Sequence, residues 1–496
     1  MQKAECSKQK IQNLGTPMER LPSAFYKLPS RGFLVPLTIV FSAVFLTIVS
    51  SLAGFLLMSK KLSAEKETRE KAIQIAEAGL EYYKWHLAHF ENDLQDGTGA
   101  AGPYVHTYND PEGGALGTFS LDINGNQECG QTTTIEIKST GTLTSNPVFK
   151  RTVTGRYSRP SVAEFSYVVN TNVWAGSDRV ITGKYHSNGG VRMDGDNRSQ
   201  VSSSVATWQC TSSFGCSGTQ TKNGVFGAGT NPSLWAFPVP QVDFAGITVD
   251  LTALKGYANN NGGRYFAPSG QSGYHAILKA DATVDVYRVT GTTQVWGYSD
   301  QDDWQQERHI IASETFVGNY SIPANCSVLF FEDKLWLEGV VKGKVTVVAA
   351  NVTQASTDVD LILRNNITYA VNDGSDGLTA IGERNALIPL TSPTNMTLYG
   401  IFIAQKGRYG RNHYVTSGSN QVPSAYDPYV QQDTLTTVGT IVSNGRTGTQ
   451  WNCGGNFCSG YENRVDSFDG RLSNSPPPFT PYTSTDYKFV EWKEEN

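Results

Sequence analysis

The chain has 496 residues, of which 39% are hydrophobic and 17% charged, and its net charge is −5. A chain of net negative charge has no global basic field to hold nucleic acid, so a nucleic-acid partner is not expected. The charged fraction lies below the roughly 25% of average soluble domains, and the 49 glycines indicate a chain that turns often. The composition therefore predicts an α+β fold that is mainly β, in more than one domain.

One segment is apolar enough to span a membrane. No charged residue occurs from Phe33 to Met58, and a helix of about 20 such residues crosses the hydrocarbon core. The core of a signal peptide is only about 7–15 residues long, and a buried helix of a soluble protein is rarely apolar on every face for so long. The sequence predicts a transmembrane helix over 33–58.

The charges that flank this span predict its orientation. Six cations precede it against two glutamates; the cations are Lys3, Lys8, Lys10, Arg20, Lys27 and Arg31. Because lysine and arginine accumulate on the cytoplasmic side, residues 1–32 are expected to form a basic cytoplasmic leader. The rest of the chain is then exported, and the span is its single-pass anchor in a bacterial membrane.

An amphipathic pattern follows the span. Apolar residues recur at alternating intervals of three and four, at Ile73, Ala76, Leu80, Tyr83, Leu87, Phe90 and Leu94. This spacing puts one apolar stripe on a helix. The helix is expected to continue over 59–97 and to end near Asp96-Gly97, where glycine takes the left-handed closing position. The stripe needs a partner, either a second helix in a coiled coil or, as we favour, the β-rich part of the same chain.

The N-terminal quarter resembles a known family. Arg31-Gly32 ends the leader, Phe33 opens the apolar helix, and KAIQIAEAGLEYYKWHL follows over Lys71–Leu87. These features resemble type IV pilin-like proteins, most closely the PilX-type minor pilins. The resemblance implies that a prepilin peptidase cuts between Gly32 and Phe33, that Phe33 is then methylated, and that the apolar half-helix moves from the membrane into a filament core.

The resemblance also implies which residues begin the packing in a filament, and it extends unevenly into the head. The packing start would be Phe33, Leu34, Val35, Pro36 and Leu37. Most pilins carry Glu at the fifth mature position, where this chain has Leu37, a departure that fits some minor or tip-located pilins. Four further segments resemble the β-rich heads of PilX-like proteins: Tyr185–Gly195, Trp336–Ala349, Gly377–Pro389 and Pro476–Glu494.

Beyond the helix, the sequence predicts a series of β regions. Period-two alternation indicates a small, pilin-like antiparallel module over 98–165. A Gly/Ser/Asn-rich β region of unassigned topology is expected over 166–310. Short apolar strands predict a β-solenoid-like head over 311–474, with an antiparallel sandwich as the alternative. A Pro-rich tail over 475–496 is expected to end in a strand at Tyr487–Trp492.

Seven cysteines fit an exported, disulfide-bonded chain. Cys6 falls in the leader, which leaves an even number for a compartment where disulfides persist. Two pairs are local, Cys210 with Cys216 and Cys453 with Cys458, and Cys129 with Cys326 would form a long-range bridge. Zinc is the competing interpretation, but neither local pair has the two-residue spacing and histidine partners of tetrahedral zinc sites.

Motifs that carry chemistry are sparse. Gly-x-Ser-x-Gly, His-Glu-x-x-His and Gly-x-x-x-x-Gly-Lys do not occur, so no catalytic residue and no cofactor are predicted. His86 and His89 lie three apart on the expected helix and are interpreted as solvated or packed rather than as metal ligands. The acidic run Asp300, Asp302 and Asp303, beside Trp304, is interpreted as a solvated turn.

One weak cation candidate is present. Asn372, Asp376 and Glu383 occupy positions one, five and twelve of a segment similar to a calcium-binding loop. Its first and third positions are Asn and Gly, so two oxygen ligands are weakened or lost. A structural turn is the favoured interpretation, and no metal is predicted.

Together these patterns predict a non-enzymatic, membrane-anchored minor pilin-like subunit that presents a large β-rich head outside the cell, with a place in a filament or at its tip as the expectation. Its expected partners are the membrane, other pilin-like subunits and the pilus assembly machinery. The alternative is a permanently tethered adhesin that holds an extracellular carbohydrate through exposed aromatic residues. A polysaccharide-degrading solenoid enzyme would require Asp358, Asp360 and Arg364 to converge in a groove.

Overall fold

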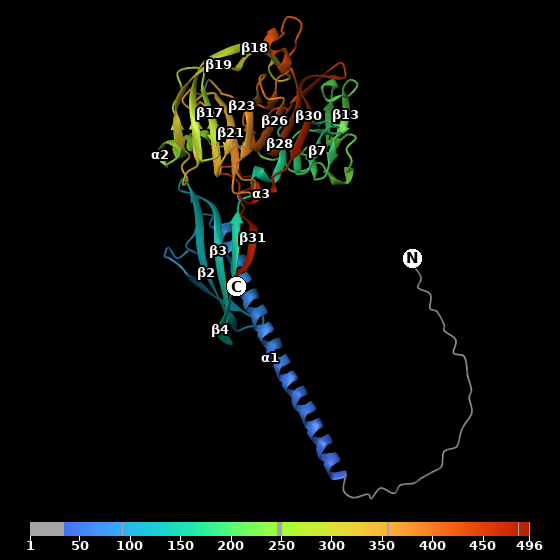
Figure 1. Cartoon of the computed structure of the whole chain (residues 1–496), viewed down its shortest axis with the longest axis vertical. Coiled ribbons are helices and arrows are strands. Elements are labelled where there is room, and N and C mark those ends of the chain that lie inside the picture. The colour runs from blue at the N-terminus through green and yellow to red at the C-terminus, as the bar shows by residue number, and fades with distance from the viewer. Residues whose placement is uncertain (1–33, 92, 246–249, 355–356, 485, 496) are drawn as a thin grey trace, which may run out of the picture. The chain divides into compact units, whose positions relative to one another are not determined.

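A computed structural model describes most of the chain beyond the leader (Figure 1). The described residues are 34–91, 93–245, 250–354, 357–484 and 486–495. The leader 1–32 and the expected cleavage site at Gly32 and Phe33 lie outside them. The chain divides into two compact units, Met1–Thr68 and Arg69–Asn496.

Helix α1 runs from Leu34 to His89 and has two different halves. Within the first unit its apolar side chains are exposed, for example Phe45 at 66% and Leu57 at 70%. Among the described residues, α1 is the one helix long and apolar enough to cross a membrane. Within the second unit, α1 buries a stripe at Ala72, Ile75, Ala76, Gly79, Leu80, Tyr83, His86 and Leu87.

The helix ends at His89, earlier than the expected end near residue 97. Asp93 explains the difference, because its carboxylate accepts hydrogen bonds from the backbone N–H groups of Gln95 and Gly97 at 2.7 and 2.5 Å. Such local bonds compete with helical hydrogen bonding. Asp96 and Gly97 do adopt left-handed backbone, with φ of 52° and 71°, but they belong to the turn that follows the helix.

The second half of α1 packs on a five-stranded antiparallel sheet. The strands are β1 (Tyr104–Asn109), β2 (Ala115–Glu128), β3 (Gln131–Leu143), β4 (Asn146–Ser158) and β31 (Lys488–Glu495), in that order across the sheet. Helix and sheet come so close that a Cβ on Gly141 would lie 2.1 Å from the carbonyl oxygen of Ala72. The stripe is therefore covered by the chain's own sheet rather than by a coiled-coil partner.

The last strand of this sheet comes from the far end of the chain. In Figure 1, β31 (red) lies beside β4, with which it pairs antiparallel. Glu491 forms an ion pair with Arg156 at 2.6 Å, and Glu494 forms one with Arg69 on α1 at 2.9 Å. The strand expected at Tyr487–Trp492 is therefore a longer edge strand that completes the small module.

The rest of the second unit is a stack of coils held by parallel strand pairs. In the order of pairing, the first ladder contains β16 (Arg264–Phe266), β20 (Val328–Phe331), β22 (Lys344–Ala349), β24 (Gly377–Gly382), β26 (Asn395–Ala404), β28 (Gln431–Ser443), β5 (Phe165–Val169), β8 (Lys184–Ser187), β11 (Val201–Ser203) and β15 (Trp235–Ala236). Because most neighbours in this ladder are separated along the chain by strands of other ladders, the chain coils rather than folding back on itself.

Three further ladders complete the coils. The second contains β17 (Tyr274–Lys279), β21 (Leu335–Val341), β23 (Leu361–Tyr369), β25 (Ala386–Ile388) and β27 (Tyr409–Arg411). The N-terminal coils have a ladder of their own, made of β6 (Val173–Ala175), β9 (Val191–Met193) and β14 (Val225–Phe226). The third runs through the later parts of β21 and β23, the first parts of β26 and β28, and β30 (Asn456–Ser467). Parallel stacking favours the expected solenoid-like head over the antiparallel sandwich.

The remaining elements decorate this stack. They are α2 (Leu251–Asn260), α3 (Gly470–Asn474), the 3-10 turns η1 (Val162–Glu164), η2 (Ser212–Phe214), η3 (Pro232–Leu234) and η4 (Ser424–Tyr429), and the strands β7 (Val180–Ile181), β10 (Asp196–Asn197), β12 (Thr207–Cys210), β13 (Gln220–Asn223), β18 (Thr283–Ser299), β19 (Asp303–Ser321) and β29 (Gln450–Cys453). Strands β18 and β19 form a long antiparallel hairpin.

The expected division of the head at 310/311 is wrong. It falls inside β19, and the coils on its two sides stack on one another through Ile441, which pairs with Tyr167. The chain first builds coils over 165–236, crosses to the other end of the stack at β16, and returns until β28 meets β5. Period analysis reads neighbours along the sequence, so it could not join segments separated by more than 200 residues.

The interior of the stack is apolar. Inward-facing aliphatic residues come from every coil, and Phe266 stacks on Phe331 with ring centroids 4.4 Å apart. Trp336 is fully buried, and its indole N–H donates to the carbonyl oxygen of His309 at 2.7 Å. The Cys129–Cys326 disulfide, with Cα atoms 4.5 Å apart, links the small sheet to the coil stack.

Candidate ligand-binding cleft

The described part of the expected packing start lies in the first turns of α1. Leu34 and Val35 are 77% and 65% exposed, and Leu37 is 43% exposed. Pro36 falls in the first turn, where the missing N–H leaves no helical hydrogen bond unmade. The residues that the pilin resemblance assigns to packing therefore present apolar surface.

The six cysteines outside the leader form three disulfides. Cys210 pairs with Cys216, Cys453 with Cys458, and Cys129 with Cys326. The two local bonds close short loops of the head, and the third joins positions 197 residues apart. These are the pairs considered from the sequence.

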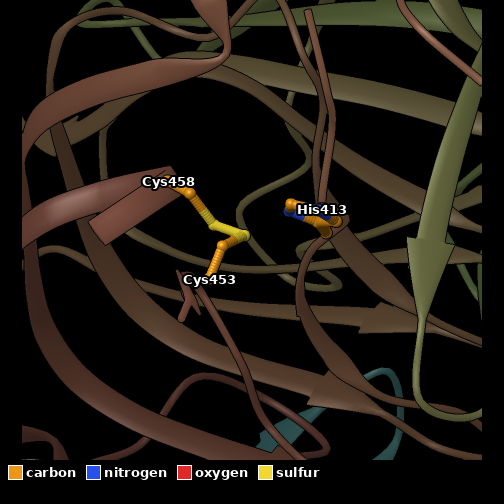
Figure 2. Close-up of side chains that lie close together, drawn as sticks. All are labelled: His413, Cys453 and Cys458. Carbon is orange, nitrogen blue, oxygen red and sulfur yellow. A yellow bond between two sulfur atoms is a disulfide. The ribbon is translucent and has the colours of Figure 1, made fainter. Parts of the chain in front are cut away.

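One disulfide lies next to a histidine. Figure 2 shows the Cys453–Cys458 bond facing the ring of His413, and the ligand-type atoms of the three residues lie within 4.8 Å of one another. Zinc binds thiolates, and both sulfur atoms are used in the bond to each other. With the disulfide formed, this cluster offers a metal only the imidazole.

The weak calcium candidates do not come together. Asp376 and Glu383 flank β24 (Gly377–Gly382), and an extended strand of this length separates its ends by about 20 Å. Asp376 accepts hydrogen bonds from the backbone N–H groups of Gly343 and Val371. Glu383 forms an ion pair with Lys406 at 3.0 Å, and Asn372 binds Arg471. Each oxygen ligand is used separately by the fold.

Asp358, Asp360 and Arg364 belong to three separate interactions rather than one groove. Asp358 forms an ion pair with Lys406 at 2.6 Å, Arg364 forms one with Glu338 at 2.6 Å, and Asp360 accepts from the side chain of Asn385 at 2.9 Å. The arrangement required for a degrading enzyme at these three residues is therefore not formed.

The helical histidines are both engaged locally. The His86 ring lies 2.8 Å from the Asp93 carboxylate, and His89 contacts the carbonyl oxygen of Trp85 at 2.8 Å. They therefore do not act as a pair. The acidic run behaves differently from the expected solvated turn, because Asp300 binds Arg446 and Asp302 binds Arg384.

Asp300 helps to form a cavity of about 330 Å³ that sequence reasoning did not find. It lies where the second ladder ends at β27 and the β6–β9–β14 ladder begins. Its lining comes from β6, the η2 loop, the β18–β19 turn, the residue before β27, and the segment from Arg446 to Arg464. We call it the Arg408 cleft, and the residues that matter chemically are Trp174, Ser213, Asp300, Arg408, Arg446, Gln450, Trp451, Asn452 and Arg464.

The three arginines of the Arg408 cleft differ in how they are neutralised. Arg446 binds Asp300, and Arg464 binds Asp178 at 2.6 Å. Arg408 is only 4% exposed, its Nε has no hydrogen-bond partner, and within the described chain it forms no ion pair. One terminal nitrogen donates to the side chain of Asn412. Burial lowers the pKa of Arg408, against the opposing effect of nearby carboxylates.

A second cavity of about 240 Å³ shares Arg408 and Ser299 with the first. It contains a buried row of charges, in which His309 lies 3.4 Å from Glu307 and 3.7 Å from Asp360. Burial alone would lower the pKa of His309, but the carboxylates of Glu307 and Asp360 raise it. The neighbouring carboxylates therefore favour the charged form of the imidazole, and the pKa values of Glu307 and Asp360 are in turn lowered by His309.

No family model matches the chain, and no curated protein sequence matches it. Among solved structures, it is similar to the competence-associated pilin ComZ from Thermus thermophilus, with 12% identity and a TM-score of 0.28. The match covers 86% of this chain and 97% of the other. A likeness this weak carries no conclusion about fold or function.

Proposed function

We propose that the chain is a membrane-anchored, pilin-like subunit of a type IV pilus-like assembly, and that it has no enzymatic activity. The observation that supports this proposal is the division of α1 into two halves. Its charge-free half exposes Leu34 to Met58, and its second half buries the stripe from Ala72 to Leu87 under the small sheet.

The exposed half needs an apolar environment that the described chain does not supply. A single helix satisfies its own backbone hydrogen bonds, so it is stable in lipid. A bundle of similar helices in a filament core covers the same apolar surface. The partners proposed are therefore the membrane, other pilin-like subunits and the machinery that moves the helix between these two environments.

Processing is proposed between Gly32 and Phe33, as the family resemblance implies, with Phe33, Leu34, Val35, Pro36 and Leu37 at the start of the filament packing. The exported side would hold the small sheet and the coil stack. A head of this size suits a low-copy or tip position, and Leu37 in place of an acidic residue supports the same position.

N-terminal sequencing and intact mass of the native protein, from membranes and from sheared surface material, test this proposal. We expect a chain that begins at methylated Phe33, and a Gly32→Val variant that keeps its leader and is lost from the sheared fraction. Gly54→Val is the matched control, because a Cβ there meets no atom within 4 Å.

An intact leader on the native surface protein would overturn the pilin assignment and favour a permanently tethered adhesin. Protease protection of the head in intact cells, with accessibility only after lysis, would contradict both assignments. Cleavage of the head by external protease in intact cells is the result expected for the proposed orientation.

A further inference from the structure

We propose that the Arg408 cleft binds an acidic saccharide, with a uronic acid carboxylate on Arg408 and the sugar ring against the indoles of Trp451 and Trp174. This proposal goes beyond the pilin assignment and does not depend on it, because every residue it uses belongs to the coil stack.

The rim of the cleft is held by covalent bonds. Ser213 lies in the loop closed by Cys210–Cys216, and Asn452 lies beside the hairpin closed by Cys453–Cys458. Arg446 joins two parts of the rim, since it binds Asp300 and donates to the carbonyl oxygen of Ser213 at 2.8 Å. A site fixed before binding loses less conformational entropy on binding a ligand.

Arg408 supplies the position for an anion. A buried guanidinium that lacks a carboxylate partner is costly unless a ligand completes its hydrogen bonds. Arg446 and Arg464 are each already paired with an aspartate, so among the described residues Arg408 is the cleft arginine that forms no direct ion pair, although carboxylates lie farther off. A single carboxylate matches that charge and the fork geometry of the guanidinium.

The indoles supply the position for a sugar ring. The N–H of Trp451 donates to the carbonyl oxygen of Arg411 at 2.9 Å, and that of Trp174 donates to Asp194 at 2.8 Å. Both polar atoms are therefore used within the protein, and the Arg192 guanidinium already covers part of the Trp174 ring at 4.3 Å, so what the two residues offer to a ligand is the ring surface that lines the cleft. The amides of Gln450 and Asn452 line the same cavity and can bind hydroxyl groups.

The volume of the cleft suits a short saccharide. A volume of about 330 Å³ lies at the lower end of the range for small-molecule sites, about 300–1,000 Å³. The second cavity shares Ser299 and Arg408 with the first, but its lining also holds the carboxylates of Asp302, Asp303, Glu307 and Asp360, so the saccharide is placed in the Arg408 cleft alone. A polyphosphate is disfavoured because it would place adjacent negative charges near Asp300, which also lines the cleft, whereas a uronic saccharide carries one carboxylate per ring.

Calorimetric titration of the full chain in detergent with tetragalacturonic acid tests the proposal. We expect binding that is lost with the fully methyl-esterified tetramer, because esterification removes the carboxylates and keeps the sugar rings. Arg408→Gln should weaken binding by about tenfold or more, the usual size of a charged hydrogen bond. Arg198→Gln is the matched control, since Arg198 is exposed and lies outside both cavities.

Arg408 is buried, so two rim variants keep the test decisive if Arg408→Gln does not fold. Asn452→Ala and Trp451→Leu should each weaken tetragalacturonate binding while the melting temperature stays within a few degrees of the wild type. Equal affinity for acid and ester, absence of binding by the wild type at millimolar tetragalacturonate, or equally tight competition by oligothymidylate would each overturn the proposal.

Discussion

The two halves of α1 differ in whether the chain covers their apolar surface. From Leu34 to Met58 the helix is apolar on all faces and exposed, and from Ala72 to Leu87 it is apolar on one face and buried. A one-sided stripe needs one surface, which the chain's own sheet provides. A helix that is apolar all round needs an environment on every side. The comparison shows which apolar surface of the helix the chain covers with its own sheet and which surface requires lipid or another subunit.

The largest expected effect comes from charging the exposed half. Phe45→Arg combined with Val49→Arg should make membrane insertion less favourable by about 5–7 kcal/mol, from about 2.5–3.5 kcal/mol for each arginine near the helix centre. Carbonate extraction of membranes should then release the variant. The pair Phe45→Leu and Val49→Leu should stay in the membrane, and full retention of the arginine variant would contradict the anchor.

Truncating a side chain in the buried half of α1 should lower the stability of the fold instead. Tyr83 has no exposed surface, and its hydroxyl donates to the carbonyl oxygen of Asp93 at 2.5 Å. Tyr83→Ala should therefore lower the free energy of unfolding by about 3–5 kcal/mol, as for other large core truncations. Denaturant unfolding measures this. Trp85→Ala on the same helix, where the side chain is 55% exposed, should change it by less than about 0.5 kcal/mol.

Removing the long-range disulfide should have an intermediate effect on the module that holds the buried half. Cys129→Ser with Cys326→Ser opens a loop of 197 residues and should cost about 2–4 kcal/mol. Hydrogen exchange should accelerate in β2 and β3 more than in the coil stack. Cys453→Ser with Cys458→Ser is the comparison, and uniform acceleration in both parts would contradict a linking role.

The smallest expected effect is a dependence of stability on pH, which concerns the buried half of α1 and not the exposed half. Burial alone would raise the pKa of Asp93, but hydrogen bonds from the N–H groups of Gln95 and Gly97 and from His86 lower it. Its contribution to stability is therefore present above the unfolded pKa of about 3.9 and lost as pH falls through the lower folded value. Asp93→Asn should remove this acid-side loss.

Membrane retention provides the control for that pH test. The segment from Leu34 to Met58 contains no ionisable side chain, so sedimentation with membranes in high salt should be equal at pH 3 and pH 7. Glu91→Gln, at an exposed position beside the helix end, should leave the acid-side unfolding curve unchanged. If Asp93→Asn left the acid-side unfolding curve unaltered, the proposed contribution of Asp93 to stability would be contradicted.

The sequence predicted those parts of the fold that depend on local pattern. The helical stripe, the period-two strands of the small sheet and the Gly/Asn-rich short strands of the head are all visible over a few residues. The order of the coils was not predictable, because Ile441 and Tyr167 pair across the whole head. The Arg408 cleft was missed for the same reason, since Trp174, Arg408 and Trp451 share no spacing along the chain.

The threading of the coils also fixes when the molecule can be finished. The coils over 165–236 are made first, yet the base on which they rest is β28, and β4 meets its outer neighbour only when residues 488–495 arrive. Contacts between such distant segments form slowly. Until residues 431–443 are made, the coils over 165–236 lack the strand on which they stack, and until residues 488–495 are made, the small sheet lacks its edge strand.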